Sequence, residues 1–185
     1  MSYMEYLYLN TKAMIIYLFP TECEAKPFCG LRPEASVVIS GVGMVETSAT
    51  LMRLYAKGDI RKGDVVALCG IAGSYNQELA IGSVVEVVEE CCVELPARFR
   101  GRYLNEPYTA LRGVKSNTVH TSAQRAEGAE VENMEGASLF AFAKVAGVRV
   151  VEVRSISNIV GEDSSKWDIP LATTTLAKEL LEIFP

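Results

Sequence analysis

The feature that most constrains the fold is a series of short, continuous apolar runs, rich in β-branched residues and bounded by turn residues. The runs lie at residues 14–19, 36–40, 65–69, 83–88 and 149–157, with a weaker one at 114–119. Uninterrupted apolar runs of this length are typical of strands buried on both faces, as in parallel sheets covered by helices. We therefore expect an α/β fold of three layers, αβα, around a central mixed, mostly parallel twisted sheet.

Three segments with helical periodicity alternate with these runs. We predict helices at 44–57, at 134–145 with Asn133 as its N-cap, and from Asp168 to Ile183. The apolar residues expected on one face of the first two helices are Val45, Ala49, Met52 and Ala56, and Met134, Ala137, Ala141 and Val145. Pro20 and Thr21 predict a loop after the first strand, and Gly70 and Gly73 predict a break after 65–69.

The domain organisation follows from the length and from the even spread of these elements. A chain of 185 residues with 49% hydrophobic side chains suits a single domain over 1–185, with residues 1–12 as an N-terminal extension. The irregular text from Cys91 to Arg112 predicts a long excursion from the fold. Its aromatic residues Phe99, Tyr103 and Tyr108 suit either the substrate or a subunit interface.

Composition excludes several classes of function. The chain has 23 acidic and 18 basic side chains and no Lys/Arg run, so nucleic acid is not an expected partner. No apolar run is long enough to span a membrane and the start lacks a basic signal-peptide region, so we expect a cytoplasmic protein. Five cysteines without a C-x-x-C pair and a single histidine, His120, favour reduced core cysteines and no bound metal.

Polar residues collect where the predicted strands end, which is where open α/β sheets bind ligands. They are Glu22, Glu24, Ser40, Gly41, Gly43, Gly70, Ser157 and Asn158. The predicted helix start adds Met134 and Glu135. Because a carboxylate can accept two hydrogen bonds, Glu135 suits the adjacent hydroxyls of a ribose, although an acid that only complements the helix dipole fits as well.

Four motifs in order decide between these alternatives. They are Ser-Gly-Val-Gly-Met-Val-Glu-Thr-Ser-Ala at 40–49, Gly-Ile-Ala-Gly at 70–73 with Ile-Gly-Ser-Val-Val at 81–85, Val-Glu-Asn-Met-Glu-Gly-Ala at 131–137 and Arg-Ser-Ile-Ser-Asn at 154–158. In these motifs the chain resembles the purine nucleoside phosphorylase and nucleosidase superfamily. The resemblance implies that Met134 packs on the sugar, that Glu135 holds its hydroxyls, and that Asn158 lies beside the base.

The resemblance also implies an acid after the first strand that activates water, and this acid falls on Glu24 or, two residues earlier, Glu22. We favour Glu24. Hexameric phosphorylases carry a Gly-Asp-Pro-x-Arg run at this place to hold phosphate, whereas this chain has Phe-Pro-Thr-Glu-Cys-Glu at 19–24 and no arginine. Added negative charge repels phosphate, so the sequence favours hydrolysis over phosphorolysis. One departure, Ser83 in place of the usual aspartate, leaves that position without a role.

The base specificity follows from a second departure. Nucleosidases for adenine nucleosides carry an aspartate where this chain has Asn158, and an amide donates hydrogen bonds but is no general acid. Donors suit a 6-oxopurine, so hypoxanthine or guanine is the expected base. Within the superfamily the chain is most similar to the futalosine hydrolase branch, which releases hypoxanthine in menaquinone biosynthesis. His120, near a loosely matching segment at 117–121, is a further candidate for substrate contact.

The sequence therefore predicts an N-glycosyl hydrolase for a small-molecule nucleoside, without a cofactor or metal and with the homo-oligomeric assembly of its relatives. Three alternatives stay open. They are an inosine or guanosine phosphorylase, a methylthioadenosine or S-adenosylhomocysteine nucleosidase, and a nucleoside-binding protein without catalysis.

Overall fold

The computed structural model describes residues 13–75, 77–122 and 125–185; the expected N-terminal extension, residues 1–12, lies outside the described residues. The elements in chain order are β1 (Ile15–Phe19), α2 (Glu22–Leu31), β2 (Ser36–Ile39), α3 (Gly43–Lys57), β3 (Val65–Ser74), β4 (Val84–Cys92), η1 (Ala97–Phe99), β5 (Arg102–Leu104), β6 (Gly113–Thr118), β7 (Val131–Asn133), α4 (Gly136–Ala146), β8 (Arg149–Ile159), η2 (Ser164–Lys166) and α5 (Ile169–Ile183).

The strands form one mixed sheet. Its order is β2-β1-β3-β7-β6-β4-β5, and β8 lies off this path, paired with both β3 and β4. The pairs β1/β2, β1/β3, β3/β8, β4/β6 and β6/β7 are parallel, and β3/β7, β4/β5 and β4/β8 are antiparallel. The predicted mixed, mostly parallel sheet is confirmed.

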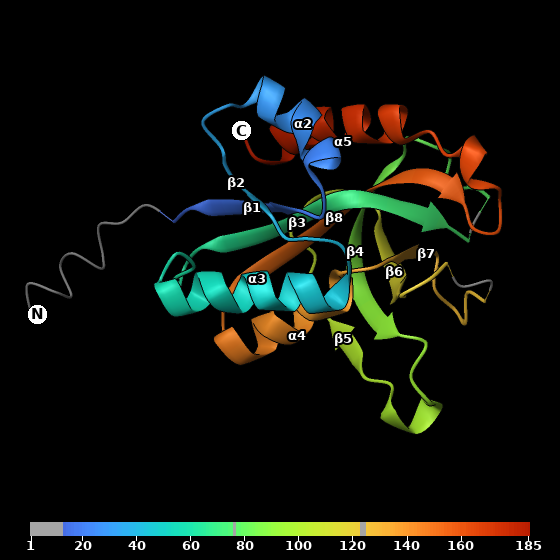
Figure 1. Cartoon of the computed structure of the whole chain (residues 1–185), viewed down its shortest axis with the longest axis horizontal. Helices are drawn as coiled ribbons and strands as arrows, with labels where there is room; N and C mark the ends of the chain where they lie inside the picture. The colour runs from blue at the N-terminus through green and yellow to red at the C-terminus, as the bar shows by residue number, and fades with distance from the viewer. Residues whose placement is uncertain (1–12, 76, 123–124) are drawn as a thin grey trace, which may run out of the picture.

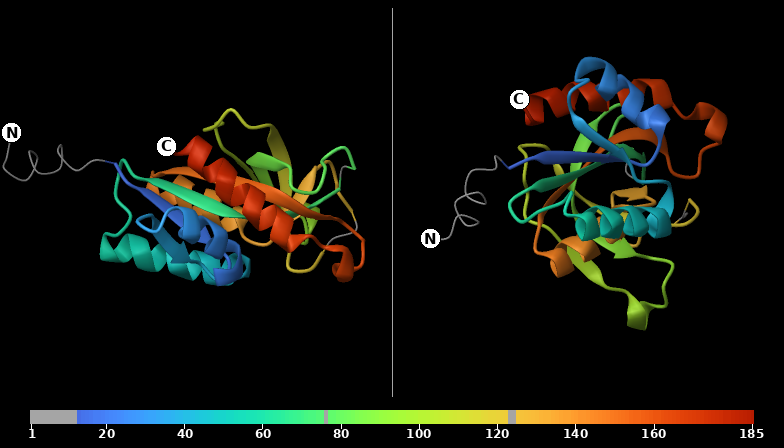
Figure 2. Two further views of the ribbon diagram at one scale, coloured as in Figure 1. Left: turned by 90° about the horizontal axis from the view of Figure 1, so that it is seen from above. Right: turned by 60° about the vertical axis from the view of Figure 1, so that its left-hand side comes forward.

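Helices cover both faces of the sheet, which makes the three expected layers. α2 and α5 pack together on one side, and α3 and α4 pack together on the other (Figure 1). The right-hand view in Figure 2 shows the same separation. Two apolar cores result, one beneath α3 and α4 around Leu51, Leu68 and Leu139, and one beneath α2 and α5 around Phe28 and Leu176.

Three strands are longer than predicted, because neighbouring strands hold their backbones beyond the apolar runs. β3 continues through Gly70 and Gly73 to Ser74, so the predicted break is wrong. β8 accompanies it along its whole length, and hydrogen bonds from a neighbour compensate for the weak strand preference of glycine. The register of this pair shifts after Ala72: Ala72 pairs with Ile156, Gly73 pairs with Asn158, and Ser157 is the extra residue of a bulge.

The predicted loop around Glu22 and Glu24 is instead the first turn of α2. Thr21 caps the helix: its hydroxyl accepts a hydrogen bond from the Glu24 amide at 3.2 Å, and the Glu24 carboxylate accepts from the Thr21 amide at 3.1 Å. This reciprocal capping box offsets Pro27 within the helix. The Thr-x-x-Glu spacing was visible in the sequence and outweighs the proline.

Two other predicted helix details are wrong. α4 begins at Gly136, and Asn133 ends β7, although its side-chain oxygen still accepts from the amides of Glu135 and Gly136, as a cap does. The predicted face of α3 is the exposed one, with Val45 73% and Met52 55% exposed. α3 carries a second stripe at Thr47, Leu51 and Leu54, and that stripe is buried against α4 and the sheet. In α4, Val145 is also exposed.

The excursion at 91–112 is more ordered than predicted, since it contains the end of β4, η1 and β5. All five cysteines are free, and Cys23 departs from the expected core placement because it is exposed. Within the described ranges, no helix combines the length and apolarity needed to cross a membrane. The same residues contain no cluster of three or more His, Cys, Asp or Glu side chains suited to a metal ion.

Candidate active site

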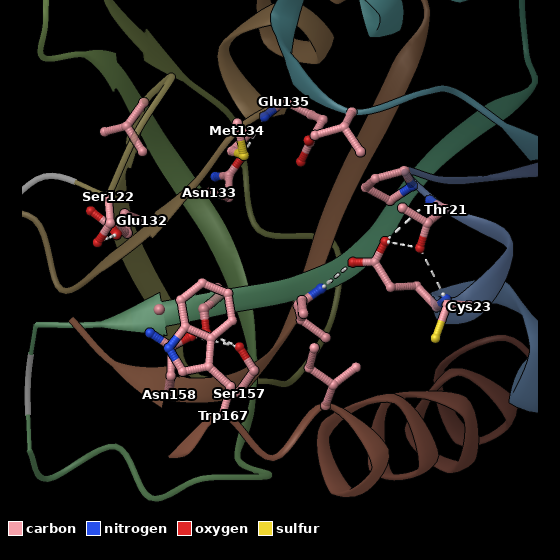
Figure 3. A pocket seen from close by; sticks show the side chains of 18 residues that line it. Thr21, Cys23, Ser122, Glu132, Asn133, Met134, Glu135, Ser157, Asn158 and Trp167 are labelled. Carbon is pink, nitrogen blue, oxygen red and sulfur yellow. Dashed lines mark hydrogen bonds between the residues drawn. The ribbon is translucent and has the colours of Figure 1, made fainter. Parts of the chain in front are cut away.

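A cavity of about 450 Å³ opens at the carboxyl ends of β1, β3 and β8, beside the start of α4. This volume suits a ligand the size of a nucleoside. The lining residues are Pro20, Thr21, Cys23, Glu24, Val42, Ile71, Ala72, Gly73, Val119, Ser122, Glu132, Asn133, Met134, Glu135, Ser157, Asn158, Trp167 and Ile169. In Figure 3, Thr21 and Cys23 lie on one side, Met134 and Glu135 on another, and Ser157, Asn158 and Trp167 on a third.

Glu24 places a buried carboxylate in the wall formed by α2. One carboxylate oxygen accepts from the hydroxyl of Thr21 at 2.9 Å, and the other accepts from the Ile71 amide of β3 at 3.2 Å. Burial raises the pKa of Glu24, an effect that nearby Arg154 and these hydrogen bonds partly offset. A fixed carboxylate of raised pKa at a cavity wall suits a general base that works near neutral pH.

Met134 and Glu135 lie in the link between β7 and α4. Glu135 is 3% exposed, and its two oxygens accept from the Gly43 amide at 2.9 Å and from the Arg154 guanidinium at 3.2 Å. Each oxygen of a carboxylate has two lone pairs, so Glu135 can still accept from a ligand in the cavity. The half-buried side chain of Met134 supplies an apolar surface next to it.

Arg154 is the functional candidate that the sequence reasoning did not single out. It is 1% exposed in β8, behind the cavity wall, and contacts Glu135. A Cβ on Gly70 would lie 2.5 Å from Arg154 Nη1 and 3.3 Å from Glu24 Oε1, so the guanidinium and the Glu24 carboxylate meet at this glycine. Arg154 therefore lies between the two site carboxylates. A charged residue within a buried strand was the available indication, since such a charge requires a partner.

Asn158 presents an amide to the opposite wall, and its neighbours decide which end of the amide faces the cavity. The Ser157 hydroxyl lies 2.8 Å from Asn158 Oδ1, and Asn158 Nδ2 lies 3.3 Å from the carbonyl of Ile159. In this orientation the amide oxygen accepts from Ser157, and one hydrogen of the NH2 group remains for a ligand. The wall beside a bound base therefore offers a donor.

The rest of the cavity wall mixes apolar and acidic groups. Trp167 follows η2 and is held near Ser157, whose carbonyl accepts from the Asp168 amide at 2.9 Å. Glu132 accepts from the hydroxyls of Tyr75 and Ser122, both at 2.6 Å. Sequence reasoning missed these residues, because loop positions such as 167 come to the site only through the tertiary fold.

Several predicted site residues lie outside the lining. Gly43 reaches the site through its amide contact with Glu135, whereas Ser40 and Gly41 form the turn between β2 and α3. Gly70 lies behind the wall, where it makes room for Arg154. Glu22 is exposed at the start of α2. His120 is also exposed, and its Nε2 lies 3.9 Å from Glu94 Oε2. Its neighbour Val119 lines the cavity instead.

The excursion at 91–112 also contributes nothing to the lining. Phe99 is 62% exposed, and Tyr108 stacks near Phe184 at a centroid distance of 5.8 Å. Tyr103 packs on the core beneath α3 and α4. Within this chain, these aromatic residues therefore do not reach the cavity.

The fold and the site define a class of protein, and comparison with known proteins agrees with it. The model of a family described as the Phosphorylase superfamily matches residues 108–185. This match and the relative described below make the chain similar to proteins of the nucleoside phosphorylase and nucleosidase superfamily.

The chain is 28% identical to the futalosine hydrolase of Thermus thermophilus over an alignment of 211 positions, which covers 89% of this chain and 92% of that protein. A mutant futalosine hydrolase of Helicobacter pylori is similar in structure, with a TM-score of 0.78, 17% identity, and coverage of 93% of this chain and 98% of the other. The 5′-methylthioadenosine/S-adenosylhomocysteine nucleosidase of the same organism gives a TM-score of 0.79, 17% identity, and coverage of 94% and 98%.

Proposed function

We propose that the protein is a nucleosidase that hydrolyses the N-glycosidic bond of a 6-oxopurine nucleoside, with futalosine as its substrate and hypoxanthine as the released base. The observation that carries the proposal is the joint placement of Glu24, Glu135 and Asn158 on three walls of one cavity of nucleoside size. The similarity to a futalosine hydrolase over most of both chains supports the choice of substrate.

The charges of the cavity support water as the nucleophile. Three carboxylates, from Glu24, Glu132 and Glu135, belong to the lining, and the lining residues of the described chain include no Lys, Arg or His. A phosphate dianion would meet repulsion here without a facing cation. Water hydrogen-bonded to Glu24 would meet a base that already holds a fixed orientation.

The reaction we propose is a displacement at C1′ with a loose, oxocarbenium-like transition state. Glu24 accepts a proton from water while the water oxygen forms a bond to C1′. The bond between C1′ and the purine nitrogen breaks, and its electron pair leaves with the base, where the Asn158 NH2 group stabilises the developing negative charge. Glu135 holds the ribose hydroxyls, and Met134 packs against the sugar, so the reacting atoms are aligned.

Assembly into a homo-oligomer is part of the same proposal. Val42, which lines the cavity, is 50% exposed, and Val45 and Met52 on α3 are more exposed still. An apolar surface that begins at the cavity opening suits a second copy of the chain. Sedimentation equilibrium tests this directly, and a monomer at micromolar concentration would contradict it.

A substrate panel tests the function. Purified protein is incubated with futalosine, inosine, adenosine and 5′-methylthioadenosine, each with and without phosphate, and both the base and the sugar product are identified. We expect free hypoxanthine and an unphosphorylated sugar from futalosine, at a rate independent of phosphate. A strict requirement for phosphate would contradict hydrolysis. Cleavage of methylthioadenosine alone would contradict the 6-oxopurine specificity.

A further inference from the structure

Behind the site lies a second pair of carboxyl groups that the proposed reaction does not use. Glu90 in β4 and Glu152 in β8 are both fully buried, and neither belongs to the cavity lining. Burying an ionised carboxylate is costly unless charges or hydrogen bonds compensate for it. Two such groups at one place therefore require a physical explanation.

The two carboxyl groups face each other across Gly136. A Cβ on this glycine would clash with both Glu90 Oε1 and Glu152 Oε2, so the two oxygens meet in the space that a side chain at this position would fill. Glu152 Oε1 accepts from Arg154 Nε at 2.8 Å, whereas Glu152 Oε2 has no hydrogen-bond partner among the described residues. Glu90 accepts from the Thr118 hydroxyl at 2.6 Å and from the Asn133 amide.

The surrounding charges do not neutralise this pair. Arg154 is the only buried basic side chain in the described part of the chain, and it already serves Glu135 and lies near Glu24. Four carboxyl groups therefore surround one guanidinium. Cys69, which also lies near Glu152, adds no charge, because burial raises the pKa of its thiol.

A proton between the two carboxyl groups resolves both problems, because it removes one negative charge and gives Glu152 Oε2 a partner. The direction of the pKa shifts agrees with this. Burial, and then the charge of Glu90, raise the pKa of Glu152 to about 8 against the opposing effect of Arg154. Burial likewise raises the pKa of Glu90, although its hydrogen bonds to Thr118 and Asn133 oppose the shift.

We propose that Glu90 and Glu152 share one proton and that this protonated pair positions Arg154 between Glu135 and Glu24. Glu152 Oε1 holds Arg154 Nε, which sets the plane of the guanidinium, and Nη2 then reaches both Glu135 Oε2 at 3.2 Å and Asn133 Oδ1 at 3.0 Å. The Asn133 side-chain NH2 group donates to Glu90, which links Arg154 to Glu90 through Asn133. Glu90 and Glu152 are positioning residues, and their effect on turnover rests on the proposed nucleosidase function.

Kinetics of two variants tests the positioning role. Glu152→Gln keeps an acceptor for Arg154 and a donor toward Glu90 but cannot ionise. We therefore expect kcat/KM for futalosine to stay within about fivefold of the wild type at pH 6.5, a factor that corresponds to about 1 kcal/mol. Glu152→Leu removes the acceptor, and we expect a loss of about a hundredfold, since small misplacements of reacting groups have that effect.

The pH profile separates positioning from a merely structural role. In the wild type, kcat/KM should fall as the pH rises through about 8, where the pair loses its proton and its carboxylates repel each other. In Glu152→Gln this decline should be absent. Glu86→Gln is the matched control: Glu86 is also fully buried in β4, but its carboxylate accepts from the amides of Tyr108 and Thr109 and not from Arg154, so the decline should persist in this variant. A decline of equal size in the wild type and in Glu152→Gln would overturn the proposal.

Unfolding by denaturant tests the shared proton without any substrate. A carboxyl group whose pKa is raised in the folded state contributes stability that is complete below its unfolded value of about 4.3 and is lost as the pH rises through its folded value. For Glu152 this window runs up to about 8. The denaturant concentration at the unfolding midpoint of Glu152→Gln, relative to that of the wild type, should therefore increase between pH 5 and pH 9.

The two measurements have separable outcomes. An unchanged difference in midpoint between pH 5 and pH 9 would refute the shared proton, whatever the chain cleaves. If the substrate panel shows no hydrolysis but the midpoint difference still increases with pH, the nucleosidase function fails and the protonated pair stands.

Discussion

The two ends of the cavity differ in the side chains that face the substrate. The end that we assign to ribose and water consists of buried ions: Glu24, Glu135 and, behind them, Arg154, each held by several hydrogen bonds. At the end that we assign to the base, the neutral Asn158 amide lies beside Trp167, which is 37% exposed. The Glu132 carboxylate nearby accepts from the hydroxyls of Tyr75 and Ser122. Both ends come from strand ends, and β8 contributes to each.

This difference separates catalysis from selectivity. Buried charges act strongly because little water screens them, but each depends on its partners, so a change in one disturbs the others. A neutral amide acts more weakly and more independently than these charges. We therefore expect substitutions at the ionic end to lower the rate for every substrate, and substitutions at the neutral end to change mainly which base is accepted.

Glu24→Gln should have the largest effect. Gln keeps the size of the side chain but cannot accept a proton from water, and loss of a general base typically lowers kcat by a factor of about 10² to 10⁴. Single-turnover kinetics with futalosine measures the loss, and calorimetry should still detect binding of the nucleoside. Glu22 offers a control from the same helix turn: because it is exposed and outside the cavity lining, Glu22→Gln should retain most of the rate. A wild-type rate in Glu24→Gln would show that Glu24 is not the general base.

Glu135→Gln should come next. A hydrogen bond to a charged group contributes about 1.5 to 3 kcal/mol, so we expect kcat/KM to fall about tenfold to a hundredfold. Comparison with a 2′-deoxynucleoside sharpens the test, because loss of the sugar hydroxyl should cost the wild type more than it costs the variant. Equal losses in both proteins would show that Glu135 does not contact that hydroxyl.

Asn158→Asp should change selectivity at the neutral end. A carboxylate accepts from the 6-amino group of adenine, whereas it leaves the oxygen of a 6-oxopurine without a donor. We expect the ratio of kcat/KM for adenosine to that for inosine to rise by about tenfold to a hundredfold. Ser157→Ala is the companion change, because it frees the amide to turn over and should reduce discrimination without reversing it. An unchanged ratio in Asn158→Asp would separate this residue from the base.

Trp167→Ala should have the smallest effect. Stacking of a base on an aromatic ring contributes about 1 to 3 kcal/mol, and the exposure of Trp167 favours the lower end of that range. We expect KM to rise by about fivefold, with a smaller change in kcat. An equal rise in KM for all purine nucleosides would show that Trp167 stacks on the base without selecting it. A fall in kcat larger than the rise in KM would instead place Trp167 close to the reacting atoms.

Sequence patterns predicted the sheet and, at the cavity wall, Glu24, Met134, Glu135, Ser157 and Asn158, because buried strands and their polar ends are local features. The start of α2 was missed although Thr21 and Glu24 have the spacing of a capping box, since Pro20 and Thr21 suggested a loop. The buried face of α3 was predicted wrongly because the helix carries two plausible stripes and only packing against α4 selects one. The position of Arg154 depends on partners from β4, β7 and α2, which no local pattern relates.

The bulge at Ser157 has a consequence for how such a protein can diversify. β8 holds Arg154 in strict register with β3, but the register shifts before Asn158. The last residues of the strand therefore pair with β3 in a different register from the part that carries the buried ions. Substitution, insertion or loss of a residue beyond the bulge can remodel the pocket for another leaving group while the catalytic charges keep their places. Proteins built on this scaffold can therefore change their substrate specificity without changing the catalytic residues.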